Sequence, residues 1–298
     1  MPEIKILIAP PGAGKTTWAM EYLKEHPDDT VHISSDETRN KLFGDETCQD
    51  DPRRVFGTMC SNAADALKNG FNVIYDATDM TRKSRRQIIG SVPKGTTVTA
   101  QIIWRSPEKC VEADKERTRT VGEHVIDRMI RSFQAPYYDE GFDKIEWHLN
   151  VTDFFLPAAY FYHVWHQCDI SQDNPHHSMT VVEHNMFVGA YLLKLGVPVE
   201  LVTAGNFHDI GKPYVKDFHN SKGEPTEIAH YYGHQGYSAW LSIPCLTYHS
   251  FRNDDTRKIC WLISNHMEPY MNTRYYRNLP PELKTELDLL HEADENAR

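Results

Sequence analysis

The sequence lacks the features that would place it in a membrane or in an oxidising compartment. No stretch approaches the roughly 18 consecutive apolar residues of a membrane-spanning helix. The six cysteines are scattered and none forms a CxxC pair, which indicates free thiols rather than a disulfide framework. No signal peptide is expected, because a strand begins within the first few residues. We therefore expect a cytoplasmic protein without a membrane partner.

An excess of basic residues is absent as well. The chain has 32 lysines and arginines against 42 acidic residues, for a net charge of −10. This argues against nonspecific binding of nucleic acid through total charge, but an enzyme acting on nucleic acid needs only a local basic patch. One such patch is Arg82, Lys83, Arg85 and Arg86, which we interpret either as a solvent-exposed helix face or as contacts to phosphate.

The 298 residues suit two domains, and the two halves differ in composition. Residues 151–298 hold 12 of the 16 histidines. Because imidazole is a good ligand for transition metals, the second half is expected to carry a different chemistry from the first. We predict one domain over residues 1–150 and another over residues 151–298.

Strands and helices alternate in the first half. Apolar runs predict strands at residues 4–9, 31–35, 72–76 and 98–104. The segments 15–24 and 52–69 are predicted helices, and Gly70 follows the second of them as a stop signal. Such alternation predicts an α/β fold, with a parallel sheet that has helices on both faces.

A glycine-rich loop follows the first predicted strand and precedes the first predicted helix. Its backbone N–H groups can surround phosphates, Lys15 can reach the β- and γ-phosphate oxygens, and Thr16 can bind Mg²⁺. Ala9 stands where such loops usually have glycine, and another small residue can serve at that turn. The residues predicted to bind ATP, or another nucleoside triphosphate, with Mg²⁺ are Gly12, Ala13, Gly14, Lys15, Thr16 and Thr17.

Two charged residues follow the second predicted strand. Asp36 stands at the carboxyl end of that strand, where ligands bind in a parallel sheet, and Arg39 lies one helical turn further on. The Asp36 carboxylate can accept the proton of an attacking hydroxyl, and Arg39 can hold an acceptor phosphate with two hydrogen bonds. The alternative interpretation is an N-cap aspartate beside a surface arginine.

These motifs resemble the 5′-polynucleotide kinases of phage and bacterial end-healing enzymes, over about the first 150 residues. The resemblance rests on PPGAGKTTWA, SSDETRNKL, the strand end at residues 76–78 and a basic segment at residues 115–131. It implies that Asp36 is the general base for a 5′-hydroxyl. It also implies that Arg39 holds the phosphate on the 3′ side of the reacting nucleoside.

The basic segment at residues 115–131 resembles the lid of these kinases. Lid arginines neutralise negative charge on the phosphoryl group during its transfer. By this resemblance Arg119 is the best candidate, with either Arg117 or Lys115 as its partner; the spacing does not decide between the two. A solvent-exposed helix is the alternative interpretation of the segment.

The second half is predicted to be an all-α bundle, because no strand pattern of comparable strength occurs in it. The predicted helices are 179–195, 198–210, 233–243, 255–266 and 281–297. Histidine or aspartate residues stand on or at the ends of these helices: His184, His208, Asp209, His234, His266 and Asp294. One ligand from each helix, directed at the core, is how helical bundles build metal sites. Imidazole and carboxylate together suit Mn, Fe, Co, Ni or Zn better than Mg.

The order of these residues resembles the HD phosphohydrolase superfamily, over most of residues 174–298. The features shared with HD domains of bacterial tRNA nucleotidyltransferases are NPHH, EHN, HDIGK, YGHQ, NHM and the late EAD. The resemblance implies a core metal site of His184, His208, Asp209 and Asp294. His234 and His266 would complete a second metal site or bind the scissile phosphate, and Lys212 would stabilise negative charge.

Four further histidines in the second half are expected to lie around the metal site or on the surface. They are His176, His177, His230 and His249. His249 is the strongest candidate among them for an additional ligand. The resemblance singles it out because some two-metal HD enzymes use a further histidine.

A 5′-kinase joined to an HD phosphoesterase has a chemical logic. Ribonucleases that use the 2′-hydroxyl leave a 2′,3′-cyclic phosphate and a 5′-hydroxyl, whereas ligases often need a 3′-hydroxyl and a 5′-phosphate. We therefore predict a bifunctional enzyme that repairs RNA or DNA ends and cooperates with a ligase. The alternatives are a nucleoside or small-metabolite kinase fused to an HD nucleotide phosphohydrolase, and an ATP-gated regulatory protein. The sequence leaves the metal, the RNA or DNA preference and the oligomeric state open.

Overall fold

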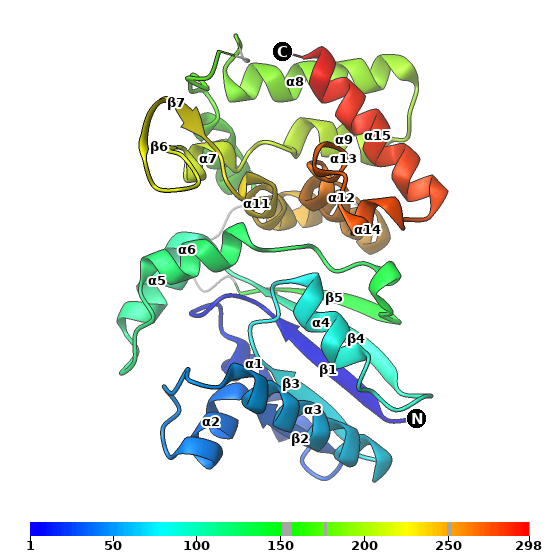
Figure 1. Cartoon of the computed structure of the whole chain (residues 1–298). Coiled ribbons are helices and arrows are strands. Elements are labelled where there is room, and N and C mark those ends of the chain that lie inside the picture. Colours follow the sequence, from blue (N-terminus) through cyan, green and yellow to red (C-terminus); the bar gives the residue numbers. More distant parts are fainter. Residues whose placement is uncertain (151–156, 176–177, 249–251, 298) are drawn as a thin grey trace. The chain divides into compact units, whose positions relative to one another are not determined.

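The computed structural model describes residues 1–150, 157–175, 178–248 and 252–297 (Figure 1). The chain forms two compact units, one of Met1–Asp127 with Pro136–Asn150 and the other of Arg128–Ala135 with Val151–Arg298. The domain boundary after residue 150 stays a prediction. Among the described residues, no helix combines the length and the apolar character needed to cross a lipid bilayer.

The first unit is built on a five-stranded parallel sheet with the order β2-β3-β1-β4-β5. The strands are β1 (Glu3–Ile8), β2 (Thr30–Ser34), β3 (Asn72–Asp76), β4 (Thr97–Trp104) and β5 (Lys144–Leu149). In β1 and β4 nearly every residue is buried. Because successive side chains of a strand point to opposite faces, the central strands are covered on both faces. This confirms the predicted α/β class.

Helices and one 3-10 turn connect the strands. They are α1 (Lys15–Glu25), α2 (Ser35–Phe43), α3 (Pro52–Lys68), α4 (Arg82–Ile89), α5 (Pro107–Lys115), α6 (Glu123–Arg131) and η1 (Tyr138–Glu140). Helix α3 begins with an Asp51 cap and Pro52, and its apolar stripe of Val55, Met59 and Ala63 is buried. The helix ends before Gly70, as its sequence predicts.

The second unit is mainly helical, as predicted. Its helices are α7 (Pro157–Gln167), α8 (Val181–Leu195), α9 (Val199–Phe207), α10 (Lys212–Val215), α11 (His234–Tyr248), α12 (Asn253–Asn265), α13 (Glu268–Met271), α14 (Arg274–Arg277) and α15 (Pro281–Asn296). Helix α8 opens with a capping box, in which Thr180 and Glu183 each satisfy the other's backbone N–H. The α8–α9, α11–α12 and α9–α12 pairs form the packed centre.

The second unit contains one β-hairpin, which the predicted all-α bundle did not include. Strands β6 (Asp217–His219) and β7 (Pro225–His230) pair as an antiparallel hairpin. Most of their side chains are exposed, so the strands have no apolar alternation by which to recognise them. Backbone hydrogen bonds of Asn220 close the turn: its N–H donates to the Glu224 carbonyl, and its carbonyl accepts from the Gly223 N–H. Gly223 has a positive φ of 80°, which favours glycine.

Residues 128–135 are an integral part of the second unit although they precede β5 in the chain. Phe133 is buried and its ring meets Trp240 edge-on, with ring centroids 5.1 Å apart. The backbone N–H of Ala135 donates to the Ser264 hydroxyl over 3.3 Å. A Cβ at Gly236 would lie 2.4 Å from the Arg131 carbonyl oxygen, so this close approach requires glycine.

Candidate active sites

The glycine-rich loop of the first unit has the backbone conformation that its sequence predicts. Gly12 and Gly14 have φ angles of +79° and +100°, which favour glycine. A Cβ at Gly12 would also lie 2.2 Å from the Cys110 carbonyl oxygen. The Lys15 ammonium donates to the carbonyls of Ala9 and Pro10, over 3.0 and 2.9 Å. Two carbonyl groups of the loop therefore hold the Lys15 ammonium against the loop backbone.

The carboxyl end of β3 brings an acidic residue to this loop. The Thr16 hydroxyl donates to Asp76 Oδ2 over 3.3 Å, and His32 Nε2 lies 3.1 Å from the same oxygen. Burial lowers the pKa of the Lys15 ammonium, and the negative charge of Asp76 opposes that shift. A hydroxyl and a carboxylate side by side offer the oxygen ligands that Mg²⁺ prefers. The strand-end position was visible in the sequence, but a role for Asp76 was not predicted from it.

Asp36 and Arg39 lie together at the start of α2, as their spacing predicts. Ser34 caps this helix by accepting from the backbone N–H groups of Asp36 and Glu37. The buried Arg39 guanidinium donates to Asp36 Oδ1 over 2.8 Å. Arg119 Nη1 lies 4.0 Å from the same oxygen. Two guanidinium groups thus surround one half-exposed carboxylate.

The segment that carries Arg119 is held in a loop by Asp114. Its buried carboxylate accepts the backbone N–H groups of Val121 and Gly122. Arg117 lies 3.9 Å from Asp114, and its positive charge contributes to the lowered pKa of Lys15. The choice between Arg117 and Lys115 as the partner of Arg119 stays a prediction.

The basic patch of residues 82–86 does not form a continuous exposed surface. Arg85 is fully buried and makes a two-bond pair with Glu140, over 2.9 and 2.6 Å. Arg86 pairs with Asp139 over 3.3 Å, and Arg82 is buried. The patch therefore includes a structural ion pair that the spacing of its residues did not distinguish from phosphate contacts.

Two residues that support the phosphate loop were missed in the sequence. Arg105 donates to the Gly12 carbonyl and Asn150 to the Ala13 carbonyl, each over 2.9 Å. Both follow strands, β4 and β5, at the edge of the sheet that carries the loop. Strand-end polar residues were a signal that could have identified them.

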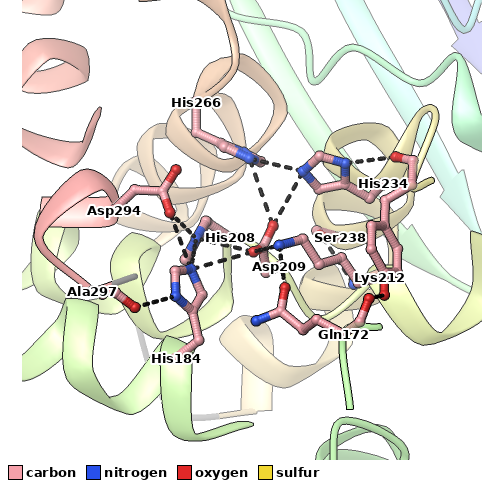
Figure 2. Close-up of polar contacts among 12 residues, drawn as sticks. Gln172, His184, His208, Asp209, Lys212, His234, Ser238, His266, Asp294 and Ala297 are labelled. Atoms are coloured by element: carbon pink, nitrogen blue, oxygen red, sulfur yellow. Dashed lines mark hydrogen bonds and ion pairs between the residues drawn. The ribbon is translucent and has the colours of Figure 1, made fainter. Parts of the chain in front are cut away.

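In the second unit the predicted ligands converge from separate elements (Figure 2). His184 lies on α8, His208 and Asp209 follow the end of α9, His234 opens α11, His266 follows α12, and Asp294 lies on α15. The four imidazoles and Asp209 are buried. These groups form two sets of three: His184, His208 and Asp294, and Asp209, His234 and His266.

Asp209 joins the two sets through its two oxygens. Oδ2 lies 3.4 Å from the Nε2 atoms of both His184 and His208. Oδ1 lies 3.1 Å from His234 Nε2 and 3.7 Å from His266 Nε2. The sequence grouped Asp209 with the first set; the structure places it between both. A carboxylate in this position can bridge two cations.

Each imidazole is oriented by a backbone carbonyl on its far side. His208, His234 and His266 direct Nδ1 to the carbonyl three residues earlier, over 2.7, 2.7 and 2.8 Å. His184 Nδ1 lies 3.1 Å from the Ala297 carbonyl. A carbonyl only accepts, so Nδ1 carries the proton in all four rings. In the neutral form of each ring, Nε2 is then left with a lone pair that faces the centre, as in metal-ligating histidines.

The nitrogen and carboxylate oxygen atoms that face one another in the two ligand sets would be stabilised by a cation between them. Nε2 atoms face each other at 3.2 Å between His184 and His208, and at 3.0 Å between His234 and His266. Burial acts to lower the pKa of His208, but Asp209 and Asp294 together raise it above its ordinary value. Burial and the neighbouring histidines lower the pKa of His266 to about 3, so its ring is neutral at neutral pH. The donor set fits a transition metal.

Lys212 lies beside this centre. Its ammonium is 2.6 Å from Asp209 Oδ2 and donates to Gln172 Oε1 over 2.7 Å. Burial acts to raise the pKa of Asp209, but His208 and Lys212 hold it well below its ordinary value. His230 stacks on Tyr232 outside the two ligand sets, while His176, His177 and His249 lie outside the described residues.

Family models match both units. A model described as an AAA domain matches residues 5–136, and a model described as an HD domain matches residues 181–295. No curated protein gives a significant match. The two matched segments contain Lys15, Asp36 and Arg119 on one side and all six predicted metal ligands on the other.

Solved structures give partial likenesses. One is a chain of the Pnkp1/Rnl/Hen1 RNA repair complex, with 25% identity and a TM-score of 0.41, covering 48% of this chain and 46% of that chain. A fungal RNA kinase has 18% identity and a TM-score of 0.38, covering 51% and 76%. A gluconokinase from Sinorhizobium meliloti 1021 has 13% identity and a TM-score of 0.37, covering 51% and 85%. This chain spans about half the length of the first of these. The TM-scores lie below 0.5, so the likenesses identify neither substrate nor partner.

Proposed function

We propose that this chain, which carries an N-terminal P-loop kinase domain and a C-terminal HD domain, repairs the ends of RNA or DNA. The kinase would phosphorylate a 5′-hydroxyl end with ATP. The HD domain would hydrolyse a 2′,3′-cyclic phosphate or a terminal phosphate. The observation that carries the proposal is the pair of complete polar sites, because each unit brings together the residue types that its half of the repair needs.

In the kinase reaction Asp36 would accept the proton of the attacking 5′-hydroxyl. Arg39 already holds this carboxylate, and its remaining N–H groups can bind a phosphate on the 3′ side of the acceptor. Lys15 would exchange its bonds to Ala9 and Pro10 for phosphate oxygens of the nucleotide. Arg119 and Arg117 would neutralise charge that develops on the transferring group.

Magnesium in the kinase would be held by Thr16 and the nucleotide, with Asp76 beside them. When bound, it neutralises the charge of the β- and γ-phosphates. The pairing of Thr16 with Asp76 keeps both oxygen groups at the loop before a nucleotide arrives. The site is thus expected to use Mg²⁺, an ion that prefers oxygen ligands.

In the HD domain, His184, His208 and Asp294 would hold one metal ion, and His234 and His266 a second, with Asp209 between them. When bound, such ions supply an activated water and stabilise charge on a phosphoryl oxygen. The carbonyls behind the imidazoles fix the ring orientation in advance. Lys212 would donate to a phosphate oxygen of the substrate from the side of Asp209.

A single labelled oligonucleotide tests both halves. It carries a 5′-hydroxyl and a 2′,3′-cyclic phosphate, and is incubated with ATP and Mg²⁺, with and without Mn²⁺, Ni²⁺ or Co²⁺. We expect 5′-phosphorylation with Mg²⁺ and removal of the cyclic end with a transition metal. Phosphorylation of a free nucleoside as efficient as that of the oligonucleotide would contradict the polynucleotide assignment, because a nucleoside offers Arg39 no 3′ phosphate.

A further inference from the structure

Gln172, which the sequence did not single out, lies between α7 and α8 and is only 1% exposed. Both polar atoms of its side-chain amide form hydrogen bonds. Oε1 accepts from the Lys212 ammonium over 2.7 Å, and Nε2 donates to the Met179 carbonyl over 3.3 Å. Its own carbonyl accepts the hydroxyl of Tyr231. A buried amide with these partners is fixed in orientation (Figure 2).

The amide limits where the Lys212 ammonium can be. A lysine side chain has four rotatable carbons and three N–H donors, so an exposed one samples many positions. Here one donor is directed to Asp209 Oδ2 at 2.6 Å and a second to Gln172. The Tyr231 ring covers the ammonium at 5.4 Å. One N–H donor remains for a further acceptor at the centre of the HD site.

We infer that Gln172 is a positioning residue for the HD reaction: it holds the Lys212 ammonium beside Asp209, so that the remaining N–H reaches a nonbridging oxygen of the phosphate ester. The inference rests on the proposed phosphoesterase function. Without the Gln172 acceptor, Lys212 keeps its bond to Asp209 and its contact with the Tyr231 ring, and its ammonium can rotate about that bond. Its third N–H is then no longer directed at the substrate.

Three substitutions separate this role from a purely structural one. Gln172→Met keeps the unbranched shape and removes both polar ends. Gln172→Glu keeps the acceptor for Lys212 but loses the N–H that bonds the Met179 carbonyl. Lys212→Met removes the group through which Gln172 is argued to act, and Gln167→Met, at an exposed position on α7, is the matched control.

The first measurement is kcat and KM for hydrolysis of a 2′,3′-cyclic phosphate by the Mn²⁺-loaded protein. We expect Gln172→Met to lower kcat by about 10- to 100-fold, with bound manganese unchanged. Gln172→Glu should retain most of kcat, although it melts at a lower temperature. In the Lys212→Met background, Gln172→Met should cause no further loss, because its effect passes through Lys212.

The second measurement is the affinity of the Mn²⁺-loaded protein for inorganic phosphate by calorimetry. Gln172→Met and Lys212→Met should each weaken it by about 10-fold, and the double variant by no more. If the wild type binds phosphate in this way but hydrolyses no cyclic end, the proposed function fails, and only the part of the inference in which Gln172 directs Lys212 at a bound phosphate holds. Phosphate affinity equal to wild type in Gln172→Met, additive losses in the double variant, or a Glu variant as impaired as the Met variant would overturn the inference.

Discussion

The two candidate sites differ in how far they are assembled before a ligand binds. In the kinase unit, Lys15 is bonded to carbonyls of its own loop, and Asp36 is half-exposed beside two arginines. In the proposed kinase reaction these contacts would be exchanged when nucleotide and acceptor bind. In the HD unit, each imidazole is fixed from behind by a carbonyl, and the Nε2 atoms already face one another.

The difference follows from what each site must bind. A kinase receives two large, charged substrates, so its predicted residues stand in the first turns of α1 and α2 and in the loop that carries Arg119, where they can change partners. A metal ion is small and needs several ligands at fixed distances, so its residues are buried on packed helices. The comparison teaches that substitutions in the HD site should act through loss of metal, whereas those in the kinase site should act on one substrate at a time.

The largest expected effect comes from Asp209→Ala. The variant loses the carboxylate that lies between both ligand sets, so we expect several kcal/mol less transition-state stabilisation and a loss of cyclic-phosphate hydrolysis of about 10³-fold or more. Bound Mn²⁺ should fall in parallel, as measured by elemental analysis. The 5′-kinase should stay close to wild type.

Asp217→Ala is the control for this change, because it removes an exposed aspartate from the same unit. Lys15→Ala gives the converse test and should abolish only the kinase. If Asp209→Ala hydrolyses the cyclic end at the wild-type rate, the HD assignment is wrong. A folded Asp209→Ala protein without kinase activity would show coupling between the two activities.

The next effect in size is that of Asp36→Asn on phosphoryl transfer. Asparagine preserves an oxygen for Arg39 but cannot accept the proton of the 5′-hydroxyl, and loss of a general base typically costs about 10²–10⁴-fold. ATP affinity, measured by calorimetry, should be unchanged because the phosphate loop is intact. Full transfer activity in this variant would remove Asp36 from the mechanism.

Much of the fold could be predicted because its signals are local. The predicted bounds of the strand at residues 72–76 and of the helix at residues 52–68 agree with the observed bounds to within one residue. Apolar runs, a proline at the start of the helix and a glycine after its end define them. The β6–β7 hairpin could not be predicted, because its pairing depends on turn contacts rather than on a buried face. The packing of residues 128–135 in the second unit could not be predicted either, because it depends on contacts with residues distant in the sequence and not on a periodic pattern of apolar residues.

The candidate sites divide in the same way. His208 and Asp209 are recognisable as a motif, but the bridging place of Asp209 depends on how helices distant in the sequence pack. Arg85 was indistinguishable from its exposed neighbours, since Glu140, the residue that pairs with it, lies 55 positions away. Gln172 has no sequence signal, because a single buried glutamine is defined only by its partners.

Phe133→Ala tests whether the segment before β5 stabilises the helical unit. Removing a buried phenylalanine typically costs about 3–5 kcal/mol, and here the Trp240 contact is lost as well. We expect faster hydrogen exchange in α11 and α12, with the central strands of the sheet little affected. Phe142→Ala, at a buried position of the first unit, should show the reverse pattern. Equal effects of both variants on both units would indicate that the chain unfolds as one body.

The smallest expected effect is that of Arg39→Ala on acceptor binding. A charge-assisted contact between arginine and phosphate contributes about 1.5–3 kcal/mol, so KM for a 5′-hydroxyl oligonucleotide should rise by about 10- to 150-fold. KM for ATP should barely change, because Arg39 contacts Asp36 rather than the phosphate loop. Lys41→Ala removes an exposed cation from the same helix and controls for general electrostatic attraction. The rise should disappear for a free nucleoside, which has no 3′ phosphate to lose contact with. A selective loss of ATP affinity would instead assign Arg39 to the donor side, and the kinase would then lack a described residue that distinguishes a polynucleotide from a nucleoside.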